Sequence, residues 1–216
     1  MSFFQNTCKP KGIGGKIMVH MMNTGHSSMA EWGFTHMEIQ SDNVCLDIGC
    51  GGGANVRKLL EKSPYGRVVG IDHSEISVEK SLTNIRPEIY CFKCSNYIES
   101  FTSEREFHDI PLQDFTTLTF YPCFIDFFAF FYTDFWPDIS EAFKKVYKIL
   151  KIGGTFMICN ESNGENPKDE KWTKIIQGMK IYNSEQIEKS LEDAGFRGVK
   201  VDKTKKGWIC VVVKKL

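Results

Sequence analysis

The 216-residue sequence has no net charge and no long apolar run. Lys plus Arg and Asp plus Glu are each 27, so composition gives no electrostatic reason to expect a nucleic-acid or acidic-membrane partner. The N-terminal segment MSFFQNTCKPKGIGG lacks the apolar core of a signal peptide. No window of about 18 residues is apolar and free of charges, so no membrane span is expected either.

The eight cysteines lack the spacing of a zinc site. Cys91 and Cys94 form one C-x-x-C, but a structural zinc ion needs four ligands and no second pair follows, so no metal is expected. Cys45, Cys159 and Cys210 lie within apolar runs and are predicted to be buried free thiols. Without a secretion signal, a cytoplasmic location with reduced cysteines is the expectation.

What the sequence does contain is an alternation of strands and helices typical of an α/β domain. Val44–Ile48 is a short apolar run suited to a buried parallel strand, and Ala54–Lys62 follows it with helical spacing. Arg67–Ile71 is a second such strand, and Ser74–Asn84 is a second helix with Ser74 as its N-cap. This order predicts the first half of a doubly wound sheet.

The other segments are less evenly patterned. We expect a loose arm over residues 1–16, an interrupted helical region over Lys16–Met37, a third strand at Ile89–Lys93 and a fourth within Phe120–Tyr132. The C-terminal part is predicted to hold a helix from Asp138 or Ser140 to Leu150, a strand at Thr155–Cys159, a helix at Asn183–Ala194 capped by Asn183 or Ser184, and β segments at Val199–Asp202 and Trp208–Val213.

A glycine-rich turn joins the first predicted strand to the first predicted helix. Gly49, Gly51 and Gly53 remove Cβ atoms where the strand turns into the helix, so a ligand can approach the backbone there. The start of the helix also presents free N–H groups. Taken alone, this spacing also suits a dinucleotide, which leaves a nicotinamide-dependent oxidoreductase as an alternative.

Asp47 and Asp72 narrow the choice of ligand. Asp47 precedes the first glycine by two residues, where it would repel a pyrophosphate but attract the ammonium and sulfonium groups of S-adenosylmethionine. Asp72 ends the second strand, at about the spacing at which an acid binds a ribose in such folds. One carboxylate can accept hydrogen bonds from both ribose hydroxyls, although Asp72 could also cap the helix that follows.

With these residues in place, the sequence resembles the class I S-adenosylmethionine-dependent methyltransferases. The resemblance rests on Asp47-x-Gly49-x-Gly51-x-Gly53, on Gly70-Ile-Asp72 and on Leu150-Lys-Ile-Gly153-Gly154-Thr-Phe. It implies a Rossmann-like, doubly wound, seven-stranded sheet whose last strand is antiparallel. It also implies that Asp47 and the glycines lie near the methionine part of the cofactor and Asp72 on its ribose. We include the neighbouring Cys50 and His73 in the predicted cofactor site.

The segment after the third predicted strand departs from the family pattern. Glu106-Phe107 can be aligned with the acid and apolar residue that contact the adenine, with Asn96 as the rival for the acid's role. The expected Phe-Asp-Leu-Val strand is replaced by Phe124–Phe131, either because this interval has diverged sharply or because of a compensated reading-frame change. A domain that binds S-adenosylmethionine without activity therefore remains an alternative.

Catalytic residues are hard to predict because the sulfonium of the cofactor is already activated, so the enzyme mainly aligns the acceptor and excludes water. Met22-Asn23-x-x-His26 and Trp32-Gly33-Phe34 resemble the N-terminal lid of small-molecule methyltransferases, which makes His26 the candidate base. Tyr132 is the second catalytic candidate, since it follows the predicted fourth strand.

We thus expect two regions: an arm with lid helices over residues 1–40, and the S-adenosylmethionine-binding domain over residues 41–216. The N-terminal methionines either line an adaptable pocket for a small organic acceptor or pack in the core. The predicted function is methyl transfer from S-adenosylmethionine to a small molecule, without nucleic acid or membrane as partner.

Overall fold

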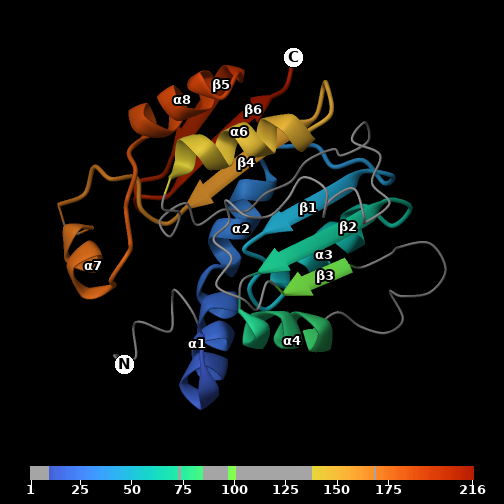
Figure 1. Cartoon of the computed structure of the whole chain (residues 1–216), viewed down its shortest axis with the longest axis vertical. Coiled ribbons are helices and arrows are strands. Elements are labelled where there is room, and N and C mark those ends of the chain that lie inside the picture. The colour runs from blue at the N-terminus through green and yellow to red at the C-terminus, as the bar shows by residue number, and fades with distance from the viewer. Residues whose placement is uncertain (1–9, 73, 85–96, 101–137, 168) are drawn as a thin grey trace.

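The computed structural model describes residues 10–72, 74–84, 97–100, 138–167 and 169–216. Figure 1 shows its strands between layers of helices. The helices and strands are, in chain order, α1 (Gly12–Gly25), α2 (Ser27–Phe34), β1 (Val44–Ile48), α3 (Ala54–Lys62), β2 (Arg67–Asp72), α4 (Glu75–Asn84), β3 (Tyr97–Ser100), α6 (Ile139–Ile149), β4 (Thr155–Asn160), α7 (Glu170–Ile175), α8 (Ser184–Asp193), β5 (Arg197–Lys203) and β6 (Ile209–Lys214).

The first three strands form a parallel sheet in the order β1-β2-β3. Asp47 lies opposite Gly70, so the carboxyl ends of β1 and β2 meet at one edge of the sheet. The sequence placed these two strands correctly, because buried parallel strands are continuous apolar runs. The strand beside β2 is Tyr97–Ser100. The predicted strand at Ile89–Lys93 lies outside the described residues.

The last three strands form a second sheet in the order β4-β6-β5, and β6 is antiparallel to both of its neighbours. This confirms the predicted antiparallel last strand. The described residues contain six strands in two three-stranded sheets. The predicted fourth strand, within Phe120–Tyr132, falls outside them.

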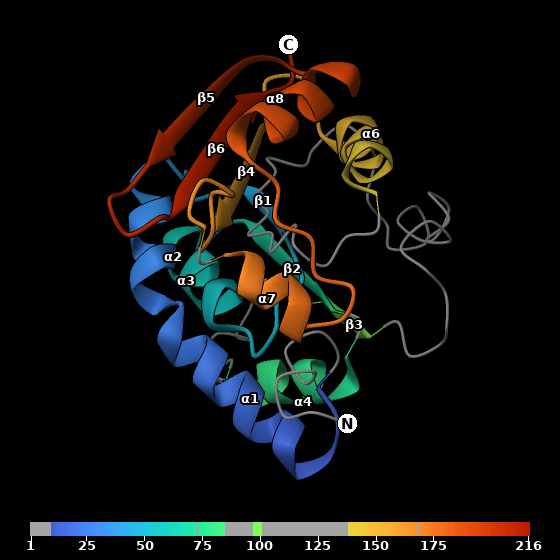
Figure 2. The ribbon, with the colours of Figure 1, turned by 90° about the vertical axis from the view of Figure 1, so that its left-hand side faces the viewer.

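Helices cover both faces of the strands (Figure 2). One core lies under α6 and α8, where Phe143 packs against Phe156 with ring centroids 5.5 Å apart. On α6 the buried residues follow helical spacing from Ile139 to Val146, as predicted, and the side chain of Asp138 caps the helix by accepting from the backbone N–H groups of Ser140 and Glu141.

A second core lies on the opposite face, where α2 and α3 pack against alternate residues of β1 and β4. Leu46 and Ile48 belong to the first core and Cys45 to the second, as expected for a strand buried on both faces. Met29 is buried in this second core, so for this methionine core packing is the correct interpretation.

The N-terminal region is more ordered than the sequence indicates. α1 begins at Gly12, so the prediction of a loose arm through residue 16 is wrong at its C-terminal end. The reason is tertiary packing: Gly15 lets the backbone of Pro10 lie directly against α1, and Ser74 donates a hydrogen bond to the carbonyl of Pro10 at 3.3 Å. In the described part of the chain, no helix is long and apolar enough to cross a membrane.

Candidate functional site

The glycine turn connects β1 to α3 in a left-handed backbone conformation. Gly49, Gly51 and Gly53 have φ angles of 76°, 52° and 78°, which L side chains rarely adopt. Gly53 is the N-cap residue of α3, and no side chain caps this helix. A Cβ added at Gly49 would meet no atom within 4 Å. The turn is therefore open at Gly49, where a ligand can approach the backbone closely.

Asp72 ties this turn to the next helix. Its Oδ2 accepts a hydrogen bond from the N–H of Gly51 at 2.9 Å, and its Oδ1 accepts one from the N–H of Ser74 at 2.8 Å. Ser74 in turn accepts from the N–H of Ser77 at 3.4 Å, as the predicted N-cap would. A carboxylate has about four acceptor positions, so one such group can bind backbone N–H groups and ligand hydroxyls at the same time.

Asp47 and Cys50 lie beside Asp72. Asp47 is only 1% exposed, near the carboxyl end of β1. Burial raises the pKa of the Cys50 thiol well above its usual value, and the negative charges of Asp72 and Asp47 raise it further. The site thus gathers two carboxylates and a protonated thiol, and this negative environment favours a cationic ligand over a pyrophosphate.

Two helices hold the turn from its sides. A side chain at position 52 would collide with Asn23 and Val19 of α1, and one at position 53 would collide with Ser81 of α4. Asn84, at the end of α4, donates a hydrogen bond to the carbonyl of Gly52 at 2.7 Å. The sequence indicated only Asn23, through its lid motif.

His26 lies where α1 meets α2, next to the residue that follows β4. Its Nε2 is 3.4 Å from Oε1 of Glu161, and its side chain is 22% exposed. The structure thus gives the candidate base an acidic neighbour from a distant part of the sequence. Sequence reasoning missed Glu161 because no local pattern links positions 26 and 161.

Four predicted site residues fall outside the described part of the chain. They are His73, Glu106, Phe107 and Tyr132, as is Asn96, the alternative to Glu106. The described part of the candidate site consists of the carboxyl ends of β1 and β2, the glycine turn, and the parts of α1 and α4 that pack against this turn. Among the described residues there is no cluster of three or more His, Cys, Asp or Glu able to hold a metal ion.

The residues present fit S-adenosylmethionine. The left-handed glycine turn offers backbone to the amino-acid part of a ligand, buried Asp47 offers negative charge, and the Asp72 carboxylate is an acceptor of the type that binds ligand hydroxyls. Each of these groups comes from the carboxyl end of a parallel strand or from the turn after it, which is where open α/β sheets bind ligands.

Comparison with known proteins points in the same direction. Residues 39–198 match the family described as "Methyltransferase domain". The chain is 23% identical over 169 residues to the sterol 24-C-methyltransferase of Debaryomyces hansenii, covering 74% of this chain and 41% of that enzyme. It is 21% identical over 203 residues to the uncharacterized methyltransferase YdaC of Bacillus subtilis, covering 91% and 96% of the two chains.

A solved structure shares the fold. The Haemonchus contortus phosphoethanolamine N-methyltransferase 2 in complex with S-adenosyl-L-methionine aligns with a TM-score of 0.72 at 15% identity, covering 100% of this chain and 60% of that one. The present chain spans less than half the length of the sterol methyltransferase that it matches. The matched domain, the Rossmann-like fold and the geometry of the glycine turn agree: the chain belongs to the class I S-adenosylmethionine-dependent methyltransferases, with S-adenosylmethionine as its cofactor.

Proposed function

We propose that this protein transfers a methyl group from S-adenosylmethionine to a small organic acceptor. The observation that carries the proposal is the position of Asp72, which binds the glycine turn and the start of α4 at once and lies beside the buried Asp47. In this proposal residues 41–216 bind the cofactor, and residues 1–40 contribute the helices that cover it.

On the cofactor side, Asp47 would neutralise the ammonium group, and Asp72 would accept the ribose hydroxyls while keeping its two backbone bonds. Gly49, Gly51 and Gly53 would admit the ligand to the backbone. We expect Cys50 to contribute main-chain contacts, because its side chain packs in the second core. His73, Glu106 and Phe107 remain proposed cofactor residues, on the ribose and adenine side.

The bound cofactor supplies an activated methyl group, so the protein's own residues need only place the acceptor and receive its proton. His26 is the proposed base, with Glu161 holding its ring, and Tyr132 is the second proposed catalytic residue. Asn23 of α1 lies against the glycine turn. In this proposal α1 therefore covers the cofactor on the side where the acceptor binds. Enclosure excludes water, which protects the transferable methyl group.

Two named relatives support a small acceptor rather than a polymer. One is a sterol methyltransferase and the other a phosphoethanolamine methyltransferase, and both names refer to small molecules. Neither acceptor is assigned to this chain, because the identities are low. The proposal is therefore limited to the acceptor's size class.

The test is to incubate the protein with methyl-labelled S-adenosylmethionine and a cell extract separated into low-mass, protein and nucleic-acid fractions. We expect label in the low-mass fraction, reduced at least about tenfold by His26→Gln, since general-base catalysis contributes roughly 100-fold or more. Asp202→Asn, at an exposed position on β5, is the matched control and should leave labelling unchanged. Label confined to protein or nucleic acid would contradict the proposed acceptor. Binding without any labelling would instead indicate the inactive domain.

A further inference from the structure

Two cysteines face each other across the second sheet. Cys159 of β4 lies directly opposite Cys210 of β6, and opposite residues of an antiparallel pair point to the same face. Each is 1% exposed, and both belong to the second core. The sequence predicted two separate buried thiols. The structure instead makes them one cross-strand pair.

The hydrogen-bonding pattern shows what type of pair this is. On the other side of β6, Cys210 lies opposite Asp202 of β5. Two residues further along this ladder, the N–H of Thr204 donates to the carbonyl of Trp208 at 2.9 Å. Because antiparallel ladders alternate, Asp202 and Cys210 are also a hydrogen-bonded pair, so the N–H and C=O of Cys210 point toward β5.

It follows that Cys159 and Cys210 are a non-hydrogen-bonded pair. The pairing of β4 with β6 gives the same result independently. The N–H of Lys215 donates to the carbonyl of Gly154 at 3.0 Å, so Gly154 and Lys215 are a hydrogen-bonded pair. Cys159 and Cys210 lie an odd number of positions from them in the same ladder, so they are a pair of the other type. Opposite Cα atoms of such pairs are about 4.5 Å apart. A disulfide typically joins Cα atoms separated by about 4.4–6.8 Å. The two strands therefore already hold these cysteines at bonding separation.

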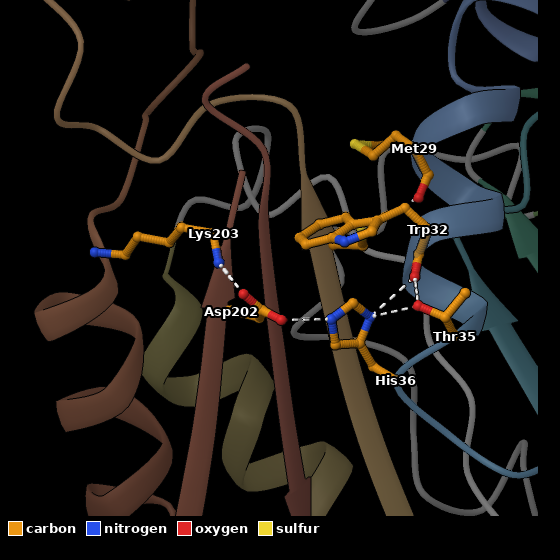
Figure 3. A network of polar contacts seen from close by, with 7 residues as sticks. Met29, Trp32, Thr35, His36, Asp202 and Lys203 are labelled. Carbon is orange, nitrogen blue, oxygen red and sulfur yellow. Dashed lines mark hydrogen bonds and ion pairs between the residues drawn. The ribbon is translucent and has the colours of Figure 1, made fainter. Parts of the chain in front are cut away.

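His36 lies close enough to Cys210 to interact with it electrostatically, and Figure 3 shows the polar contacts of this histidine. The Nδ1 atom of His36 is 2.9 Å from the carbonyl oxygen of Trp32, and its Nε2 atom is 2.9 Å from Oδ2 of Asp202. Both neighbours are acceptors, and the doubly protonated, positively charged ring donates to both of them, so this arrangement favours the charged form of His36. Burial opposes this charge, but the bond to Asp202 and the nearby Cys210 outweigh burial and raise the pKa of His36.

The two thiols are consequently unequal. Hydrogen bonding with Cys159 and the charge of His36 lower the pKa of Cys210, against the opposing effects of burial and Asp202. The same hydrogen bond, together with burial, raises the pKa of Cys159. Because His36 acts on Cys210, the thiolate is favoured at Cys210, and Cys159 is the neighbouring sulfur that can resolve its oxidation.

We propose that Cys159 and Cys210 form a peroxide-sensitive dithiol site that closes to a disulfide between β4 and β6. The Cys210 thiolate attacks one oxygen of a hydroperoxide, forming a sulfenic acid and releasing water or an alcohol once the leaving oxygen takes a proton. The Cys159 sulfur then attacks the Cys210 sulfur, the S–S bond forms, and the hydroxyl leaves with a proton as a second water. The two thiols lose two electrons and two protons, and the peroxide is reduced.

A small oxidant is required because α2 covers the pair. The main-chain carbonyl of Met29 lies 3.8 Å from the Cys159 sulfur, and both cysteines are buried. We therefore expect hydrogen peroxide to form the bond faster than oxidised glutathione, which is too large to approach without local opening. Once formed, the disulfide should raise the thermal unfolding midpoint by several degrees, because it closes a long loop.

The experiment treats the native full-length chain with hydrogen peroxide, alkylates the remaining thiols and maps peptides by mass spectrometry. We expect a Cys159–Cys210 cross-linked peptide that dithiothreitol removes. Cys159→Ser should abolish this peptide and leave a sulfenic acid at Cys210, which dimedone traps when the oxidised protein is unfolded in its presence. Cys45→Ser, which removes another buried thiol of the second core, is the matched control and should leave the cross-link intact.

His36→Gln tests the role assigned to the histidine. It keeps a polar group near Cys210 but removes the positive charge, so cross-link formation at pH 7 should slow by severalfold. The proposal is overturned if peroxide yields no Cys159–Cys210 peptide in the folded protein, or if that peptide appears only after unfolding in urea.

Discussion

At the scale of single residues, Gly53 is the most constrained glycine of the cofactor turn. It shares a left-handed φ with Gly49, 78° against 76°. A Cβ at position 53 would also lie 2.9 Å from the Cα of Ser81, whereas one at position 49 would meet no atom within 4 Å. A substitution at Gly49 therefore adds backbone strain alone, whereas one at Gly53 adds the same strain and a collision with α4.

This difference gives a matched pair of substitutions. Gly49→Ala should lower the free energy of unfolding by about 1–2 kcal/mol, the cost of a left-handed non-glycine residue. Gly53→Ala should cost about 1–3 kcal/mol more, because α4 must move to admit the methyl group. Urea unfolding of both variants measures the difference. Equal losses would show that α4 does not pack on the turn as described.

At the scale of helices and strands, a reciprocal cap fixes where α8 begins. The N–H of Gln186 donates to Oδ1 of Asn183 at 2.9 Å, and the N–H of Asn183 donates to Oε1 of Gln186 at 3.0 Å. The sequence allowed either Asn183 or Ser184 as the cap, and the structure selects Asn183. This capping box satisfies two N–H groups that the helix itself leaves unbonded.

Asn183→Ala should therefore lower the free energy of unfolding by about 1 kcal/mol. Lys189→Ala, at an exposed position within the same helix, is the control and should change it by less than about 0.5 kcal/mol. Urea denaturation with an unchanged m-value is the measurement. A loss for Asn183→Ala no larger than that of the control would mean that the cap is absent in solution.

A second link at this scale joins the end of α2 to β5. It is the ion pair between His36 and Asp202, whose carboxylate is 61% exposed. The bond to His36 lowers the pKa of Asp202, as does the hydrogen bond from the N–H of Lys203, while the pKa of His36 is raised despite burial. Each partner therefore stabilises the charged form of the other.

The His36–Asp202 ion pair makes the free energy of unfolding depend on pH. The stability that His36 contributes is complete below its unfolded-state pKa and is lost as pH rises through its raised native pKa. The stability that Asp202 contributes is complete above its unfolded-state pKa and is lost as pH falls through its lowered native pKa. The pair should thus stabilise most between about pH 4 and about pH 6.5.

The measurement is the free energy of unfolding of the native chain and of His36→Gln across this pH range. The difference between the two free energies should shrink above neutral pH. NMR titration offers a control, since Asp202→Asn should lower the pKa of His36. A difference in stability that grows with rising pH would contradict the assigned charges.

At the scale of the whole molecule, the sequence predicted the parts of the fold that have local signals. Strands β1 and β2 were found because they are buried apolar runs, and the glycine turn because its spacing is distinctive. The start of α1 was missed because Lys11 provides no side-chain cap and glycines are poor helix formers. Packing of Pro10 against Gly15 overrides that weak preference.

The candidate site likewise contains residues that local sequence patterns indicate and contacts that they do not. Asp47 and Asp72 were predicted because they follow directly from strand positions. The contacts of Asn23 and Ser81 with the glycine turn were not predicted, nor was the pairing of His26 with Glu161. These contacts join elements far apart in the chain, and residue spacing carries no information about such distances.

The central claim is that Asp72 holds the cofactor while bracing the glycine turn, and calorimetric titration with S-adenosylmethionine tests it most directly. Asp72→Ala should weaken binding by about 1–3 kcal/mol, through lost hydrogen bonds to a charged acceptor. Asp72→Asn keeps the size of the side chain but only one acceptor oxygen, so it loses one of the two backbone bonds and should also weaken binding. Urea unfolding of both variants separates lost binding from a disrupted turn. Asp202→Asn should bind like the native chain. Unchanged affinity in both folded Asp72 variants would remove Asp72 from the cofactor site and contradict the account.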